Sequence, residues 1–291
     1  MFSGLNSQNP NPLACCYRFW ADLSMEENEQ LVKHTKELAK RCYERDVLTH
    51  TPFLSPADLA AVYDAMRKDG ENLQARTFAG APYVTFGGYE DAERQCLIFL
   101  PSYEDADTFV QGEEEESQVV SCLRADPVNR HFADDLTHRD FLGALMNLGI
   151  ERDRIGDILI EESTGYLFVL KDMADYIREN LTRVRHTIVT LKEIPNRACT
   201  ARPKFEEIEG SVASERIDAV IGMVFHLSRG KAQELIEAQS VIIDGRTAWS
   251  GGYDLKQGAR VSVRGQGKFR YLGVVSETRK GRLYVKVQKY V

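Results

Sequence analysis

The sequence predicts an α+β protein with an N-terminal helical segment, a central α/β domain and a C-terminal module of two helices and a small, twisted β-sheet. Three observations predict it. Apolar residues recur at helical spacing in the first 80 residues, short apolar strands alternate with helical stretches from about Ala81 to Ile194, and the charge changes sign near Gly210. The predicted divisions are a flexible leader (1–20), the helical segment (21–80), the α/β domain (81–195), a linker (196–210) and the C-terminal module (211–291).

Two helices are expected in the N-terminal segment. Ser24 and Glu27 have the spacing of a capping box at the start of the first helix. Its expected buried face is Leu31, Val32, Thr35, Leu38, Ala39, Cys42 and Tyr43. The second helix begins at "SPAD", with Ser55 as N-cap and Asp58 three residues later, and ends at Gly70.

The central domain is predicted from the alternation of strands and helices. The expected strands are "YVTF", "CLIFL", "DILI", "GYLFVL" and "HTIVTL", and the expected helices lie around Val119–Leu123, Arg139–Leu148 and Met173–Leu181. The four glutamates from Glu113 to Glu116 are interpreted as a solvated loop or a helix start. The segment "PNRACTARPKFEEIEGS" has two prolines and no periodicity, which favours a linker.

The C-terminal module is basic and the rest of the chain is acidic. Residues 210–291 contain 14 Lys and Arg against 7 Asp and Glu, a net charge of +7. The totals of 37 and 44 leave 23 and 37 for residues 1–209, a net charge of −14. This asymmetry favours a polyanionic partner for the module and indicates that the acidic part is not a second broad RNA surface.

A phosphate site is a hypothesis for the second helix of this module, which begins at "SRGK". Ser228 is its expected N-cap, and Arg229 and Lys231 are two cations in a first turn, where the helix dipole disfavours positive charge. A bound anion would explain them, because free backbone N–H groups and cations together suit a phosphate. A solvated helix start with two surface cations is the alternative reading.

The stretch "SERIDAVIGMVFHLSRGKAQELIEAQSVIIDGR" resembles the S4 RNA-binding domain. The resemblance rests on the Arg-Ile-Asp opening, the Ser-Arg pair, the Lys-Ala-Gln and Leu-Ile of the second helix and the Asp-Gly turn. It implies that RNA contacts Arg216, Ser228, Arg229, Lys231 and Arg246. The chain departs from the pattern at Gln239-Ser240 and at Asp244, whose negative charge puts the local RNA contact in doubt.

Longer motifs extend the resemblance over most of the chain. "LTHTPFLSP", "FGGYEDAERQCLIFLPSY" and "LTHRDFLGALMNLGIERDRIGDILI", with the C-terminal position of the S4-like stretch, are similar to the YlmH-type proteins of bacterial cell-division gene clusters. This resemblance implies an RRM-like central domain and a ribosome-associated RNA-binding protein. It also implies a role with large-subunit complexes left by stalled translation, in which tRNA is still attached to the nascent chain.

The sequence therefore predicts a monomeric, cytoplasmic, non-enzymatic protein that binds structured RNA of the large ribosomal subunit, tRNA or both. The expected RNA-binding residues are Arg216, Ser228, Arg229, Lys231, Gln233, Arg246, Arg260, Arg264, Lys268 and Arg270. No catalytic residue, metal or cofactor is expected. The six cysteines lack metal-ligand spacing, and no apolar run approaches the length of a membrane helix.

The same sequence allows other interpretations. An RNA-modifying enzyme targeted by the S4-like stretch is the main alternative, although no Gly-Arg-Leu-Asp segment or glycine-rich cofactor loop is present. A third and weaker alternative is a protein-binding adaptor, whose basic module contacts an acidic partner. The "HRD" of a kinase loop lacks its Asn, and Thr137 with Asp140 fits a helix cap. His131, Asp134, Asp135 and His138 could bind a metal on paper, but a loop is favoured.

Overall fold

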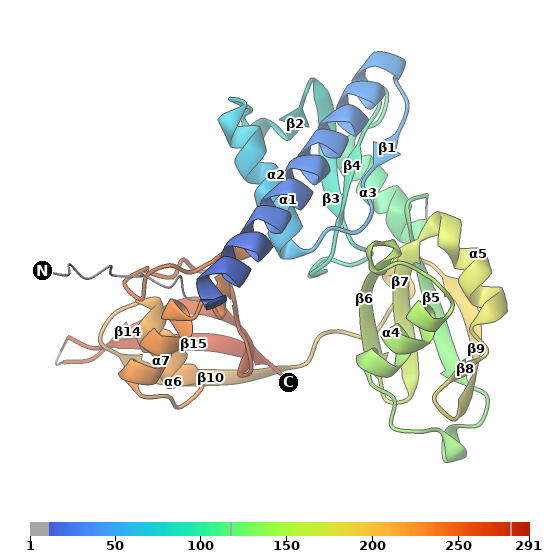
Figure 1. Ribbon diagram of the computed structural model, residues 1–291. Helices are drawn as coiled ribbons and strands as arrows, with labels where there is room; N and C mark the ends of the chain where they lie inside the picture. Colours follow the sequence, from blue (N-terminus) through green and yellow to red (C-terminus); the bar gives the residue numbers. More distant parts are fainter. Residues whose placement is uncertain (1–11, 117, 280) are drawn as a thin grey trace, which may run out of the picture.

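The computed structural model describes residues 12–116, 118–279 and 281–291, which contain three antiparallel sheets (Figure 1). The helices are α1 (Pro12–Arg45), α2 (Pro56–Lys68), α3 (Ala106–Glu115), α4 (His138–Asn147), α5 (Lys171–Asn180), α6 (Ile217–Val224) and α7 (Arg229–Glu237). The strands are β1 (Thr49–His50), β2 (Thr77–Phe78), β3 (Ala81–Phe86), β4 (Cys96–Phe99), β5 (Val120–Pro127), β6 (Ile155–Glu161), β7 (Thr164–Leu170), β8 (Arg183–Val184), β9 (Thr187–Ile194), β10 (Phe205–Val212), β11 (Val241–Ile243), β12 (Arg246–Thr247), β13 (Arg260–Val263), β14 (Gly267–Glu277) and β15 (Leu283–Tyr290).

Helices α1 and α2 cover one face of a four-stranded sheet in the order β1-β4-β3-β2. The capping box of α2 is confirmed, because the Ser55 side chain accepts from the Asp58 N–H and the Asp58 carboxylate accepts from the Ser55 N–H. The predicted buried face of α1 is confirmed at Leu38, Ala39 and Cys42 among others, but Tyr43 is 66% exposed.

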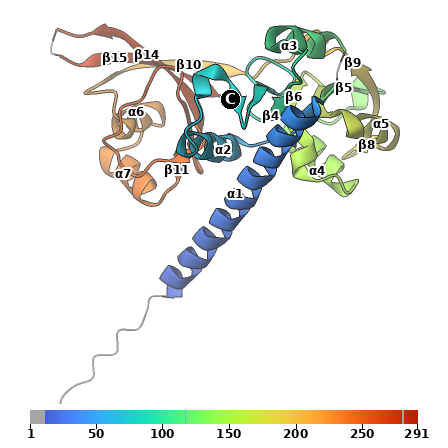
Figure 2. The ribbon, with the colours of Figure 1, turned by 90° about the horizontal axis from the view of Figure 1, so that it is seen from above.

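The start of α1 differs from the prediction. The helix begins at Pro12, so Ser24 lies inside it and is not its N-cap, and residues 12–20 of the expected leader are helical. Residues 1–11 lie outside the described part of the chain. Figure 2 shows the N-terminal part of α1 extending away from the rest of the molecule, while its C-terminal part packs in the first core. No helix in the described segments is long and apolar enough to span a membrane.

A five-stranded sheet in the order β6-β7-β5-β9-β8 follows, with α4 and α5 packed on one face. The expected helices at Arg139–Leu148 and Met173–Leu181 are confirmed, and Thr137 and Asp140 do cap α4. All five expected strands are confirmed as well, three in this sheet (β6, β7 and β9) and two in the four-stranded sheet (β3 and β4). The expected helix at Val119–Leu123 is wrong: this segment leads into β5, which lies between β7 and β9. Both faces of β5 are buried, so its apolar run has no strand alternation.

The other face of the five-stranded sheet is covered by the four-stranded sheet and α3. Val84, Phe86 and Ile98 of the first sheet share a core with Tyr166 and Phe168 of β7. The exposed fractions of Tyr166 and Phe168 are 4% and 0%. These aromatic residues are core residues, so the "GYLFVL" strand offers no open platform for stacking RNA bases.

The acidic run from Glu113 to Glu116 is also different from its interpretation as a solvated loop or helix start. It lies at the end of α3, and Glu113 is fully buried. The Glu113 carboxylate accepts hydrogen bonds from the backbone N–H groups of Gln118, Val119 and Val120, the residues that lead into β5. A buried charge is tolerated there because it satisfies three backbone donors at once.

The C-terminal module, residues 205–291, has a six-stranded sheet in the order β10-β15-β14-β13-β11-β12, packed against α6 and α7 (Figure 1). The expected linker is wrong in two places. Cys199 and Ala201 are buried in the core shared by the first two sheets. Phe205–Val212 forms β10, which pairs along its length with β15. Its partner lies about 80 residues away, which a local pattern cannot show.

Candidate nucleic-acid interface

The first turns of α6 and α7 bring together five of the residues expected to bind RNA. The Ser228 hydroxyl caps α7 by accepting from the Lys231 N–H at 3.2 Å, as predicted. Arg216 stands at the N-cap of α6. We call the group formed by Arg216, Ser228, Arg229, Lys231 and Gln233 the α6–α7 surface.

A buried carboxylate that the sequence analysis missed organises this surface. Asp218 has a side chain that is 3% exposed. It accepts two hydrogen bonds from Arg216, from Nε to Oδ1 at 3.1 Å and from Nη2 to Oδ2 at 2.8 Å, and Arg229 Nε lies 3.4 Å from Oδ2. Burial raises the pKa of Asp218, but the hydrogen bonds and charge of Arg216 outweigh it and hold the pKa below its ordinary value. The two guanidinium groups are therefore held by one permanent negative charge.

The cations of this surface remain accessible. The side chains of Arg229 and Lys231 are 75% and 56% exposed, and Lys231 contacts Glu234 at 2.9 Å. Gln233 donates to Glu237 at 3.1 Å. Trp249, which is 76% exposed, precedes a loop whose Gly251 carbonyl accepts from the Asp218 N–H. The sequence analysis missed this exposed aromatic side chain, although a tryptophan in a Gly- and Ser-containing loop is a signal that could have identified it.

Four other expected RNA-binding residues form ion pairs with carboxylates of the acidic part of the chain. Arg246 donates two hydrogen bonds to Asp64 of α2, at 3.1 and 2.8 Å. Lys268 lies 2.5 Å from Glu93, and Arg270 and Arg260 lie 2.6 and 3.5 Å from Asp91. We call Arg246, Arg260, Lys268 and Arg270 the docked face. Arg264, in the turn after β13, is exposed.

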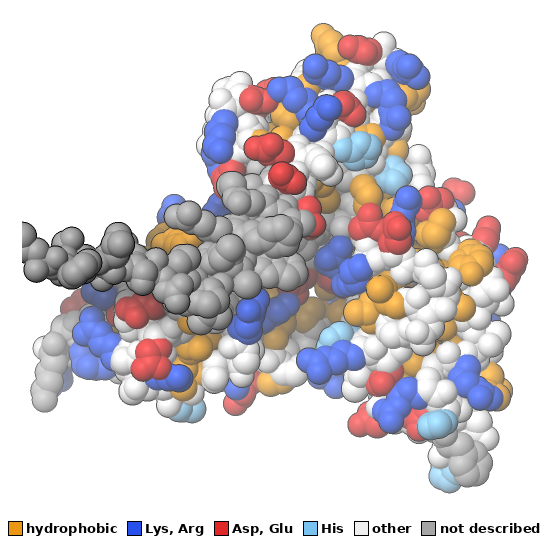
Figure 3. Space-filling model, in the orientation of Figure 1, with side chains coloured by type: hydrophobic (Ala, Val, Ile, Leu, Met, Phe, Trp, Pro, Cys, Tyr) orange, Lys and Arg blue, Asp and Glu red, His pale blue; other side chains and the backbone are white. Residues whose placement is uncertain are grey.

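The structure therefore divides nine of the ten expected RNA-binding residues into two groups, the α6–α7 surface and the docked face, and Arg264 belongs to neither. Sequence reasoning could not find the division, because Asp64, Asp91 and Glu93 are more than 160 residues away from their partners. Elsewhere on the surface, acidic and basic side chains are interspersed, as Figure 3 shows for the N-terminal helices.

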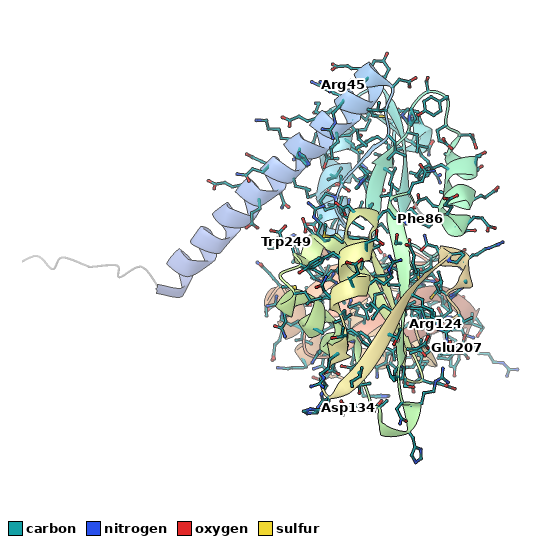
Figure 4. All side chains as sticks on the ribbon, turned by 90° about the vertical axis from the view of Figure 1, so that its right-hand side faces the viewer. Arg45, Phe86, Arg124, Asp134, Glu207 and Trp249 are labelled. Carbon is teal, nitrogen blue, oxygen red and sulfur yellow. The ribbon has the colours of Figure 1, made fainter. Side chains whose placement is uncertain are left out.

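One of the four residues that could bind a metal on paper, Asp134, has other partners. Asp134, at the end of the five-stranded sheet opposite Arg45 (Figure 4), accepts from the His186 N–H and the Thr187 hydroxyl. Within the described residues, no group of three or more His, Cys, Asp or Glu side chains could hold a metal ion.

The docked face gives a prediction for pH. Arg246 hydrogen-bonds to Asp64 and so holds the pKa of that carboxyl below its ordinary value. A carboxyl with a lowered pKa stabilises docking above its ordinary pKa and loses this contribution as the pH falls through the lowered value. We expect docking to be constant from pH 7 to about 4 and to weaken below that. The pair is nearly half exposed, so its contribution is at most about 1 kcal/mol.

This dependence is measurable as the radius of gyration by X-ray scattering during an acid titration. Asp64→Asn removes the titrating group and should lose the part of the transition that belongs to the Asp64–Arg246 pair. Asp69→Asn is the control, because Asp69 pairs with Lys36 within the N-terminal part of the chain. Identical titrations for Asp64→Asn and the unchanged protein would contradict the assignment.

The family described as "Putative RNA-binding domain in YlmH" matches residues 127–198, which span α4, α5 and the strands β6 to β9. In this segment the chain is similar to the YlmH-type RNA-binding proteins. It is similar to "Ribosome-associated protein quality control protein P2" of Bacillus subtilis (strain 168), with 29% identity over 207 residues, 70% of this chain and 76% of the relative. Neither the family description nor this relative's name denotes an enzyme.

A solved structure, "Cell division protein ylmH from Streptococcus pneumoniae", is similar over 58% of this chain and 92% of that chain, with 22% sequence identity and a TM-score of 0.42.

Proposed function

We propose that this protein is a non-enzymatic, cytoplasmic RNA-binding protein whose C-terminal module is an S4-type domain that grips structured RNA. The proposed RNA is large-subunit rRNA, tRNA or both, in the ribosome-associated quality control of stalled translation. The observation that carries the proposal is the α6–α7 surface, in which Arg216 and Arg229 share the buried Asp218.

The chemistry of this surface fits RNA phosphates. The shared carboxylate fixes both guanidinium groups, while Arg229 remains largely exposed and can accept a further anionic partner. Cations outnumber groups suited to reading bases, which favours recognition of backbone and shape. Trp249 adds an exposed ring on which an unpaired base could stack. The matched RNA-binding family and the name of the Bacillus subtilis relative support RNA and the ribosome as partners.

The test is the double change Arg229→Ala and Lys231→Ala in the full chain. We expect binding to large ribosomal subunits to weaken by a factor of roughly 100 or more, since each of the two lost charged hydrogen bonds contributes about 1.5–3 kcal/mol and about 1.4 kcal/mol corresponds to tenfold. The slope of log affinity against log salt concentration should also become shallower by about one for each lost phosphate contact. Sedimentation with subunits and crosslinking of bound RNA measure both effects.

The matched control is Lys40→Ala with Arg41→Ala, which removes two exposed cations from α1. It changes the net charge equally and should leave subunit binding unchanged. Equal losses in both variants would mean that only overall charge matters, and no loss in either would contradict the proposed role of the α6–α7 surface.

A further inference from the structure

A polar pocket of about 510 Å³ opens between the end of α4 and the β8–β9 hairpin. Its lining includes Arg139, Arg183, Arg185, Asn147, Asn180 and Thr182. We propose that this pocket is a second RNA-contact site, which binds the phosphate backbone of a single-stranded RNA segment. The inference rests on the proposed RNA-binding function and assigns to it a surface other than the C-terminal module.

The charge of the pocket is positive in a chain whose net charge is −7. All three arginines are exposed, and Asp140 is the carboxylate in the lining. Asp140 caps α4 by accepting from the Thr137 N–H at 2.8 Å and hydroxyl at 2.7 Å, and it lies 3.8 Å from Arg185 Nε. In the part of the chain that the structure describes, neither Arg139 nor Arg183 forms an ion pair. Two guanidinium groups are thus available to an anion.

Arg185 lies in a turn whose left-handed backbone conformation disfavours residues with a side chain. With His186 it connects the last pair of β8 and the first pair of β9, and its φ is +52°. A left-handed backbone costs a residue with a side chain about 1–2 kcal/mol, so Gly or Asn would suit the position better. Asp134 fixes the turn by accepting from the His186 N–H at 3.0 Å. An arginine kept in a strained position at a pocket rim points to a function for its side chain.

The pocket also has polar groups that RNA uses, and an aromatic side chain is hydrogen-bonded to one of its lining residues. Asn180 donates its amide N–H to the Tyr176 carbonyl, which leaves its amide oxygen directed elsewhere. Tyr176 of α5 is 46% exposed, and its hydroxyl donates to the carbonyl of Leu148, which lines the pocket. A fixed, half-exposed ring is a group on which single-stranded bases can stack.

The position of the pocket favours RNA over an acidic protein. The pocket residues between 139 and 185 all lie inside the matched segment 127–198. Within that segment, one sheet face is covered by α4 and α5 and the other by the four-stranded sheet. RNA binding by this segment therefore requires an edge or an end of the five-stranded sheet. The pocket lies at such a position and is rich in arginine, which suits RNA phosphates.

The first test uses Arg139→Ala with Arg183→Ala in the full chain and a fluorescent oligouridylate of about 12 nucleotides. We expect roughly tenfold weaker binding. The slope of log affinity against log salt concentration should become shallower by about 1.4, since each phosphate contact to a single strand contributes about 0.7 to that slope. The control is Arg154→Ala with Arg178→Ala, which removes two arginines that pair with Asp172 and Asp175 outside the pocket. The control should bind as the unchanged protein does.

The second test separates binding from folding. Arg185→Gly relieves the strained backbone, so we expect the melting temperature to rise by about 2–4 °C. The same change removes a cation from the pocket, so oligouridylate binding should weaken severalfold. A merely structural role for Arg185 would not make the protein more stable and a poorer RNA binder at once.

The outcomes distinguish this proposal from the proposed function. Arg229→Ala with Lys231→Ala should lose large-subunit binding but retain oligouridylate binding, which supports the pocket whether or not the subunit result holds. Unchanged oligouridylate binding by the pocket variants would overturn the pocket proposal alone. An equal loss of oligouridylate binding in the Arg154 and Arg178 control would also overturn it. So would a pocket variant that binds oligouridylate normally but no longer binds a protein of the ribosome.

Discussion

Gly245→Ala is expected to detach the C-terminal module from the rest of the protein. Gly245 has a φ of +79° in the Asp244-Gly245 turn, and a Cβ atom there would lie 2.0 Å from the carbonyl oxygen of Pro56 at the start of α2. The left-handed conformation alone costs alanine about 1–2 kcal/mol. The contact with backbone atoms cannot be relieved by a rotamer change, so we expect a further 1–3 kcal/mol, roughly, lost from docking.

The control for this change is Gly265→Ala. Gly265 has nearly the same φ, +78°, but a Cβ atom there meets nothing within 4 Å. Both variants should lose stability in thermal unfolding, whereas only Gly245→Ala should increase the radius of gyration in X-ray scattering. If both variants remain equally compact, the contact between the turn and α2 does not hold the module.

Glu113→Ala is expected to lower the free energy of unfolding by about 3 kcal/mol. It leaves three backbone N–H groups, at Gln118, Val119 and Val120, without the carboxylate that accepts from them, and each unsatisfied buried donor costs about 1–3 kcal/mol. Removing a buried charge recovers part of this cost, since burial raises the pKa of Glu113. Denaturant unfolding measures the difference.

Glu113→Gln is the graded comparison. Glu113 Oε1 accepts from Gln118 and Val119 and Oε2 from Val120, so an amide can satisfy one side and not the other. We expect a loss between those of the unchanged protein and Glu113→Ala. Glu114→Ala, which removes an exposed carboxylate from the same helix, should change stability by less than about 0.5 kcal/mol. A similar small effect at Glu113 would contradict its structural role.

The starts of α2, α4 and α7 were predictable because their signals are local, whereas the start of α1 was not. The capping boxes at Ser55 and Thr137 and the Ser228 cap each involve residues three apart in the sequence. The five expected strands were predictable because their apolar runs are also local signals in the sequence. β5 was not, because a strand buried on both faces has no alternation and its period is ambiguous.

The candidate site was predictable in its cations and not in their surroundings. The resemblance identified Arg216 and Arg229, and the structure places both on Asp218. Nothing near Arg246 or Lys268 in the sequence indicates that Asp64 and Glu93 lie against them. Similarly, the positive pocket at Arg139 and Arg183 is hidden in a segment that is acidic on average, because composition averages over faces that folding separates.

The pairing of β10 with β15 has a consequence for the order of folding during synthesis. β15 lies between β10 and β14, so the module's sheet is complete only after Leu283–Tyr290 have left the ribosome. The residues before β10 have their own cores and can fold first. The acidic partners Asp64, Asp91 and Glu93 are then in place before the basic strands emerge. The cations of the docked face can therefore pair with a folded intramolecular counter-charge as soon as they emerge.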